Sequence, residues 1–78
     1  MSMNKNYSSA DRDLLAKIGE KIRKYRSQKG YSQESFAFEC DLDRTYYSSV
    51  ERGERNISVL NLYKIAKTLG IKVGKILE

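Results

Sequence analysis

Four polar side chains recur along one segment of the sequence at the spacing of a helical stripe. They stand at i, i+3, i+4 and i+7 and are Thr45, Ser48, Ser49 and Arg52. In an α-helix this spacing places side chains on one face. Tyr47 and Val50 fall on the opposite face, where they can pack against a core. The segment predicts a helix with one buried side and one side that presents hydroxyls and a guanidinium.

These residue types suit the reading of DNA bases. The major groove admits one α-helix and shows a different pattern of donors and acceptors for each base pair. Arg44 stands in the first helical turn, and its planar fork matches O6 and N7 of guanine. Hydroxyls can bond base edges, and a threonine methyl can contact a thymine methyl. The predicted base-reading residues are Arg44, Thr45, Tyr46 and Ser48.

Phosphate contacts are predicted around the same helix. Arg52 ends the stripe, Arg55 lies in the following loop, and Ser49 shares the polar face. Gln33 is the first residue of the preceding predicted helix, and the positive end of a helix suits a phosphate oxygen. A solvent-facing glutamine explains Gln33 equally well on spacing alone. A solvated helix in an all-α interaction module is the alternative for the stripe itself.

The elements that must position these residues are helices. Capping residues, C-terminal glycines and apolar stripes predict five helices. The first runs from about Ala10 to Lys29, and the second begins after the capping residue Ser32. The third runs from its cap Asp43 to about Arg52, the fourth from its cap Ser58 to Gly70, and a short last helix covers 71–77. The predicted fold is all-α, a single five-helix domain over residues 10–78 that contains a helix-turn-helix. Residues 1–9 are predicted to form a flexible arm.

Apolar stripes also predict the core. The inward-facing residues are Leu14, Leu15, Ile18, Ile22, Tyr25, Phe36, Ala37, Cys40, Val59, Leu62, Ile65, Ala66, Leu69, Ile71, Val73, Ile76 and Leu77. Asp41 ends the second helix where glycine is usual, because aspartate tolerates the left-handed conformation better than most residues do. Glu51 lies near the inner flank, and we expect it to pair with an arginine instead of facing DNA.

Charge is distributed unevenly along a basic chain of net charge +5 and pI about 9.4. A basic small domain is consistent with a polyanionic partner, although charge alone is equally well explained by solubility. Residues 1–30 carry eight Lys or Arg and three acids, whereas residues 31–58 carry three Arg and six acids. Attraction to phosphate that is independent of sequence must therefore come partly from the flanks of the reading segment.

Composition argues against several classes of function. The chain has no histidine and one cysteine, Cys40, so a zinc site and an internal disulfide are not expected. No paired carboxylates mark a cleft, and we expect neither an enzyme nor a cofactor. No apolar run is long enough to span a bilayer, which predicts a soluble, cytoplasmic protein without a membrane partner.

An oligomer interface is predicted on the fourth helix. Leu60 and Tyr63 are one turn apart and fall off its core stripe, and Ile57 precedes them. Single exposed apolar residues need no explanation, but three together indicate a contact surface. A chain of 78 residues buries a modest fraction of its surface, so self-association is a natural source of additional stability.

A family resemblance is carried by the stretch SQESFAFECDLDRTYYSSVERGERNIS. It resembles the Cro/repressor-type helix-turn-helix family, also called XRE, which has the lambda-repressor-like fold. Within it, LDRTYYSSVERGERNIS together with LNLYKIAKTLGI is similar to the controller proteins of restriction-modification systems. The resemblance covers about residues 12–77. The sequence departs from the family pattern at two positions. Asp41 stands at the turn where the family usually has glycine, and Tyr47 replaces an aliphatic residue. These differences affect the expected geometry of the turn and the tilt of the following helix.

The resemblance implies a transcriptional regulator that binds a palindromic DNA operator as a homodimer. By this resemblance Gln33 contacts phosphate, Arg44, Thr45, Tyr46 and Ser48 read bases, and Arg52 and Arg55 are loop arginines. Dimer contacts come from the fourth and fifth helices. Two dimers on one operator and contact with RNA polymerase are further expectations. An antitoxin or phage-type repressor of the same fold and a helical interaction module without DNA remain alternatives.

Overall fold

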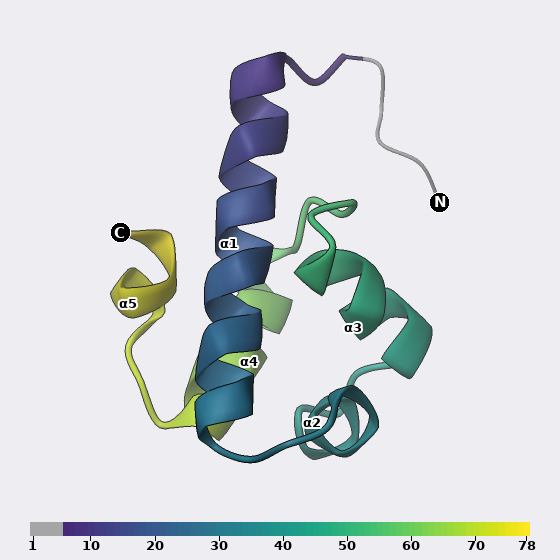
Figure 1. Cartoon of the computed structure of the whole chain (residues 1–78), viewed down its shortest axis with the longest axis vertical. Helices are drawn as coiled ribbons and strands as arrows, with labels where there is room; N and C mark the ends of the chain where they lie inside the picture. The colour runs from purple at the N-terminus through teal and green to yellow at the C-terminus, as the bar shows by residue number, and fades with distance from the viewer. Residues whose placement is uncertain (1–5) are drawn as a thin grey trace.

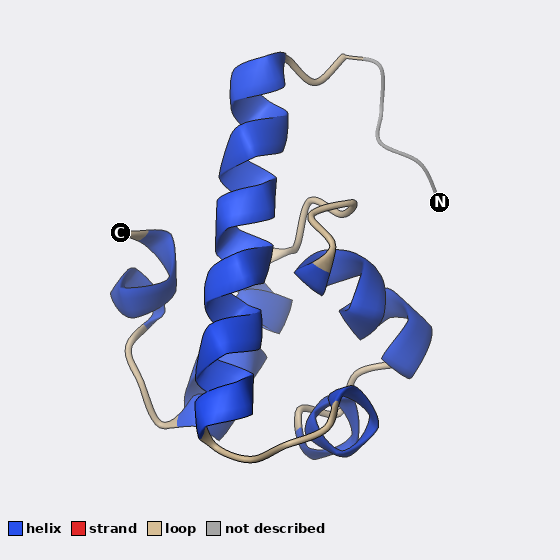
Figure 2. Ribbon diagram, viewed as in Figure 1, coloured by secondary structure: helices blue, strands red, loops and turns tan. Residues whose placement is uncertain are grey.

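A computed structural model describes residues 6–78, and its helices number five (Figures 1 and 2). They are α1 (Ser9–Gln28), α2 (Gln33–Glu39), α3 (Arg44–Glu51), α4 (Val59–Leu69) and α5 (Val73–Leu77). Residues 6–78 contain no strand, so the predicted all-α class is confirmed. Of the predicted arm, residues 1–5 lie outside the described part, and Ser9 already belongs to α1.

The long helix α1 is the element against which the others are arranged. It packs against α3, α4 and α5, while α2 packs against α3 (Figure 1). The pair formed by α2 and α3 lies on one side of α1, and α5 lies on the other. No helix within residues 6–78 is both long enough and apolar enough to traverse a bilayer.

Side-chain caps begin four of the helices, and three of these caps are the ones that the sequence predicts. The hydroxyl of Ser32 accepts from the Ser35 amide at 3.0 Å, and the Asp43 carboxylate accepts from the Tyr46 amide at 3.0 Å. Ser8 caps α1 and Ser58 caps α4 in the same way. Asp41 adopts φ 59°, which confirms the predicted left-handed residue between α2 and α3. The reading segment therefore begins at a fixed turn.

Most of the predicted core is confirmed, but three of its residues are exposed, and Leu15 is half-buried and does not pack against the core. The buried members of the core include Ile22, Phe36, Tyr47, Ile65 and Ile76. Leu14, Val59 and Leu77 were expected inside but are 52%, 85% and 49% exposed. Leu14 lies on the N-terminal half of α1, which extends past the other helices (Figure 1), and Val59 and Leu77 are the first residue of α4 and the last of α5. Periodicity identifies a helix face but not where the covering elements end.

The contact between α1 and α3 is close because α1 carries Gly19 there. A Cβ atom added at Gly19 would overlap the backbone carbonyl oxygens of Val50 and Glu51. A Cβ at Gly74, which is also helical, would meet no atom within 4 Å. The end of α3 can therefore lie this close to α1 only because glycine has no side chain.

We predict that Gly19→Ala lowers the free energy of unfolding by about 1–3 kcal/mol, because relief of the overlap must move α3 or distort α1. Gly74→Ala is the matched control and should leave stability unchanged or raise it by up to about 1 kcal/mol, the helix-propensity gain. Urea denaturation followed by circular dichroism measures both. Equal stabilities of the two variants would contradict the close packing at Gly19.

Candidate nucleic-acid interface

The polar face of α3 forms an open depression on the surface. Its lining residues are Arg44, Thr45, Ser48 and Arg52. Arg44 and Thr45 are exposed, Ser48 is half-buried, and Arg52 caps the helix at its C-terminal end. Four of the residues that the sequence analysis selected are thus brought together on one accessible surface.

Ser49 does not belong to this surface, and its predicted phosphate contact is wrong. Only 3% of Ser49 is exposed, and its hydroxyl donates to the Tyr46 carbonyl at 2.6 Å. Position i+4 of the stripe is turned toward the core, next to Val50, and a serine is tolerated there because the backbone three residues earlier accepts its proton. Of the four residues of the predicted stripe, the three that remain on the accessible surface are Thr45, Ser48 and Arg52.

Gln33 joins the first turn of α2 to the middle of α3. Its Nε2 donates to Glu51 Oε1 at 2.9 Å, and its Oε1 accepts from the Ser48 hydroxyl at 3.3 Å. Ser48 in turn accepts from Arg52 Nη1 at 2.9 Å. The solvent-facing interpretation of Gln33 is therefore wrong, while its contact with phosphate stays a prediction.

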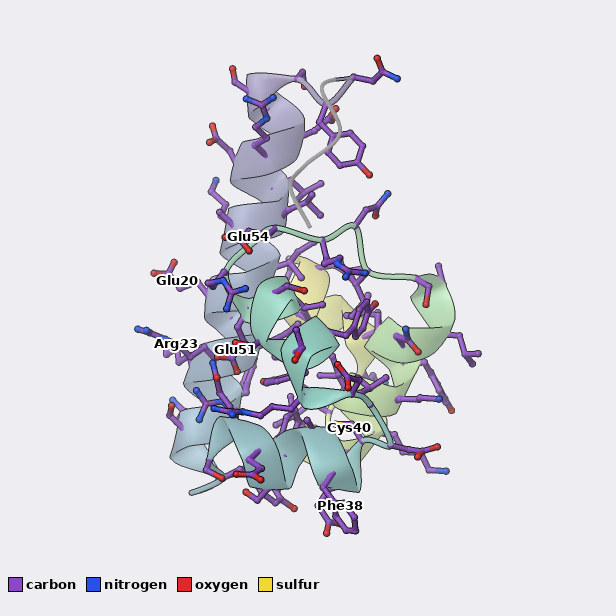
Figure 3. The ribbon with its side chains drawn as sticks, turned by 90° about the vertical axis from the view of Figure 1, so that its right-hand side faces the viewer. Glu20, Arg23, Phe38, Cys40, Glu51 and Glu54 are labelled. Carbon is purple, nitrogen blue, oxygen red and sulfur yellow. The ribbon has the colours of Figure 1, made fainter. Side chains whose placement is uncertain are left out.

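A buried ion pair lies beneath this surface. Glu51 Oε2 is 2.6 Å from Arg26 Nε, and the two side chains are 2% and 12% exposed. Tyr47 donates its hydroxyl proton to the same carboxylate, and Arg26 Nη1 also donates to the Tyr31 carbonyl at 2.8 Å. Figure 3 shows Glu51 between α1 and α3. The predicted pairing of Glu51 with an arginine is confirmed, and it links α1, the turn before α2, and α3.

The electrostatics keep this pair charged. Burial acts to raise the pKa of Glu51, but hydrogen bonds from Arg26, Tyr47 and Gln33 outweigh it, so the pKa lies below its usual value. The bond to Glu51 raises the pKa of Arg26 against the opposing effect of burial. Burial, followed by the bond to Glu51, raises the pKa of Tyr47. The carboxylate accepts from three side chains, and this makes the arrangement stable when buried.

Tyr46 is held by two residues outside α3. The guanidinium carbon of Arg55 lies 5.1 Å from the centre of the Tyr46 ring, and Asn61 Nδ2 donates to the Tyr46 hydroxyl at 3.1 Å. Arg55 Nε is buried and has no hydrogen-bond partner among the described residues. Asn61 was not predicted from the sequence, because it lies on α4 and no spacing within the helix-turn-helix relates it to Tyr46.

The predicted oligomer surface is partly as expected. Leu60 and Tyr63 are 66% and 59% exposed on α4, and Val59 adds a third exposed apolar side chain beside them. Ile57 is half-buried and packs against the core, so it supports this surface more than it forms it.

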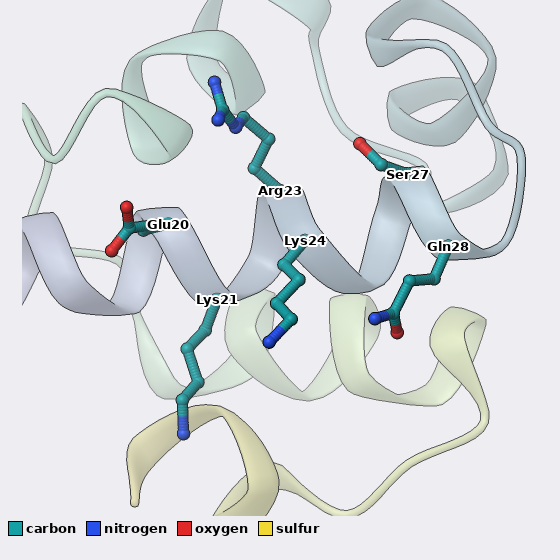
Figure 4. Close-up of a pocket in the computed structure, with 6 residues that line it drawn as sticks. All are labelled: Glu20, Lys21, Arg23, Lys24, Ser27 and Gln28. Atoms are coloured by element: carbon teal, nitrogen blue, oxygen red, sulfur yellow. The ribbon is translucent and has the colours of Figure 1, made fainter.

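A second depression lies along the exposed face of α1 (Figure 4). It is lined by Glu20, Lys21, Arg23, Lys24, Ser27 and Gln28. Lys21 is used structurally, because its Nζ donates to the Glu78 carbonyl at 2.6 Å and so holds the end of α5. This basic face is a rival location for contact with a polyanion.

A helix-turn-helix family model matches residues 22–76, which include all of α2, α3, α4 and the turns between them. The chain belongs to the XRE-type helix-turn-helix family of DNA-binding transcription regulators. It is 51% identical over 65 residues to the control protein C.MunI of a Mycoplasma species, an alignment that covers 82% of this chain and 88% of that protein.

Solved structures of two further family members have the same fold. The restriction-modification controller protein C.AhdI from Aeromonas hydrophila superposes with a TM-score of 0.77 at 45% identity, over 80% of this chain and 94% of that one. The biofilm regulator SinR, solved in complex with DNA, superposes with a TM-score of 0.75 at 35% identity, over 78% of this chain and 98% of that one.

We predict that the stability of the protein falls on acidification through the folded-state pKa of Glu51. Because that pKa is below the unfolded value of about 4.3, its contribution is present above this value and is lost as the pH drops. Glu51→Gln should be less stable at neutral pH and show a shallower decline between about pH 5 and 2. Urea denaturation across this range measures it.

Glu54→Gln is the matched control, because Glu54 pairs with Arg52 at 3.1 Å while both side chains remain about half exposed. Its unfolding free energy should change by less than about 1 kcal/mol. A Glu51→Gln variant that keeps the wild-type pH profile would contradict the role assigned to the buried carboxylate.

Proposed function

We propose that this protein is a sequence-specific transcription regulator of the restriction-modification controller type, which binds a palindromic operator as a homodimer. The observation that carries the proposal is that Arg44, Thr45, Ser48 and Arg52 line one depression on α3, a helix that the ion pair between Arg26 and Glu51 holds against α1. The similarity to control proteins supports the controller assignment over an antitoxin or a phage-type repressor.

The proposed roles of the residues follow from their places on this surface or beside it. Arg44, at the exposed start of α3, reads a guanine, and Thr45, Tyr46 and Ser48 read neighbouring base edges. Arg52, Arg55 and Gln33 bind phosphates at the two ends of the reading surface and fix its register on the duplex. Ser49 has no role in DNA binding, because it is buried.

Ion pairing explains how an acidic segment can approach DNA. Of the six acids of residues 31–58, Glu51 is neutralised by Arg26, which lies on α1 outside this segment. Another of them, Asp43, accepts from the α3 backbone. The repulsion of phosphate is reduced accordingly, and the basic flanks and a second chain supply the remaining attraction.

A homodimer supplies the second reading helix. Leu60 and Tyr63 provide an apolar patch, and two-fold symmetry then places the two α3 helices about 34–36 Å apart, one turn of DNA. As a controller the protein would regulate its own operon according to occupancy of the operator. Binding of two dimers to one operator, and contact with RNA polymerase, belong to the same proposal.

The direct test compares the affinity of the protein for its own upstream DNA with that for random duplexes at about 0.15 M salt, by fluorescence anisotropy. A regulator should prefer its operator by a factor of about a thousand or more. Equal affinities would overturn the proposal, and binding that is absent or insensitive to salt would favour a protein-interaction module.

Replacement of Arg44 tests the assignment of base reading. Arg44→Ala should cost roughly 1–3 kcal/mol on the true operator and relax specificity at one base pair, because one bidentate guanine contact is lost. Arg12→Ala is the control, since Arg12 is also exposed but lies in the first turn of α1. An equal loss on all sequences would move Arg44 to the phosphate-binding group.

Replacement of two α4 residues tests the dimer surface. The double variant Leu60→Glu, Tyr63→Glu should sediment as a monomer, because two carboxylates would be brought into an apolar contact. Phe38→Glu is the matched control, since Phe38 is 80% exposed on α2 and should leave the dimer intact. A double variant that remains dimeric would reject this interface.

A further inference from the structure

The hydroxyl of Tyr46 has a partner that comes from outside the helix-turn-helix. Asn61, in the first turn of α4, donates from Nδ2 to this hydroxyl at 3.1 Å. The backbone amide of Asn61 is separately bound by the Ser58 hydroxyl at 3.1 Å, as the helix cap requires. The Asn61 side chain is therefore not needed for the cap, and its contact with Tyr46 is available for another purpose.

The direction of this hydrogen bond decides what Tyr46 can offer to DNA. A phenol has one proton to donate and lone pairs that accept. Because Asn61 donates, the Tyr46 oxygen is the acceptor, and its own proton has no acceptor among the described residues. The contact with Asn61 therefore leaves the phenol proton unused, and it remains for donation to another group.

The ring of Tyr46 is constrained as well as its hydroxyl. The Arg55 guanidinium lies over the ring at 5.1 Å, within the range of a cation–π contact. Arg55 comes from the loop after α3 and Asn61 from α4, so the two contacts hold the ring from different elements. A side chain fixed at its face and at its tip loses little freedom on binding.

We propose that Asn61 is a positioning residue for base recognition, which holds the Tyr46 hydroxyl as a hydrogen-bond donor. Tyr46 then selects an acceptor in the major groove, such as N7 of a purine, O6 of guanine or O4 of thymine, and rejects an amino group at that position. This inference rests on the proposed function, because it assigns a chemical preference to one of its base-reading residues.

A double-mutant cycle tests whether Asn61 acts through the Tyr46 hydroxyl. The probes are a duplex selected by the wild-type protein from a random library and an unselected random duplex. Asn61→Ala should reduce the ratio of the two affinities roughly three- to tenfold, the range of one neutral hydrogen bond. In the Tyr46→Phe background, which lacks the hydroxyl, Asn61→Ala should cause no further reduction. Equal reductions in both backgrounds would overturn the proposal.

Asn61→Asp tests the direction of the bond without removing a side chain. A carboxylate only accepts, so it would take the Tyr46 proton and deprive DNA of the donor. Aspartate in the first turn of a helix is favourable, so the variant should be at least as stable as the wild type in thermal denaturation. Selection from the same library should nevertheless show altered base preference at one position of each half-site.

The outcomes separate this inference from the proposed function. A wild-type protein that binds selected and random duplexes equally would reject both. A wild type that discriminates, together with an Asn61→Asp variant that keeps the wild-type base preference, would reject only the role of Asn61. Normalising each variant to the random duplex removes the uniform repulsion that a new carboxylate exerts on DNA.

Discussion

The buried carboxylate of Glu51 is the interaction on which the arrangement of the other elements depends. It accepts hydrogen bonds from Arg26 on α1, Gln33 on α2 and Tyr47 on α3. Removing one partner of a buried pair leaves an uncompensated charge, so the three helices are tied to one geometry. Gly19 permits this closeness, because a side chain there would collide with the carbonyls of Val50 and Glu51. The position of α3 against α1 and α2 is therefore fixed by a polar contact below its exposed face.

The side chains on the exposed face of α3 are held in place by contacts at both edges of that face. Through Gln33, the buried carboxylate is connected to the hydroxyl of Ser48 and from there to Arg52. At the other edge, Tyr46 is held by Arg55 and Asn61, which belong to the following loop and to α4. A binding site needs side chains fixed within about half an ångström, and these supporting contacts would meet that need for the proposed base-reading residues. The helix that carries Asn61 also carries Leu60 and Tyr63, so the proposed dimer surface and the support of Tyr46 belong to one element.

The sequence was sufficient for the local features and insufficient for the contacts between elements. Caps at Ser32, Asp43 and Ser58 and the left-handed Asp41 are determined within a few residues, and the expected helices are present within residues 6–78. The predicted polar stripe of α3 wrongly included the buried Ser49, because periodicity does not specify how far the core extends around a helix. Leu14 and Val59 were misplaced because burial depends on where neighbouring helices end. Asn61 could not be found at all, since its partner lies fifteen residues away on a different element.

One measurement distinguishes most directly between the reading surface on α3 and the basic face of α1. Amide chemical shifts of the labelled protein would be followed during titration with a duplex that carries the selected operator, at about 0.15 M salt. The account predicts changes concentrated from Gln33 through α3 to Arg55, with Arg23 and Lys24 little affected. Changes concentrated at Arg23 and Lys24, with α3 resonances unmoved, would contradict it and show that DNA is held by charge alone.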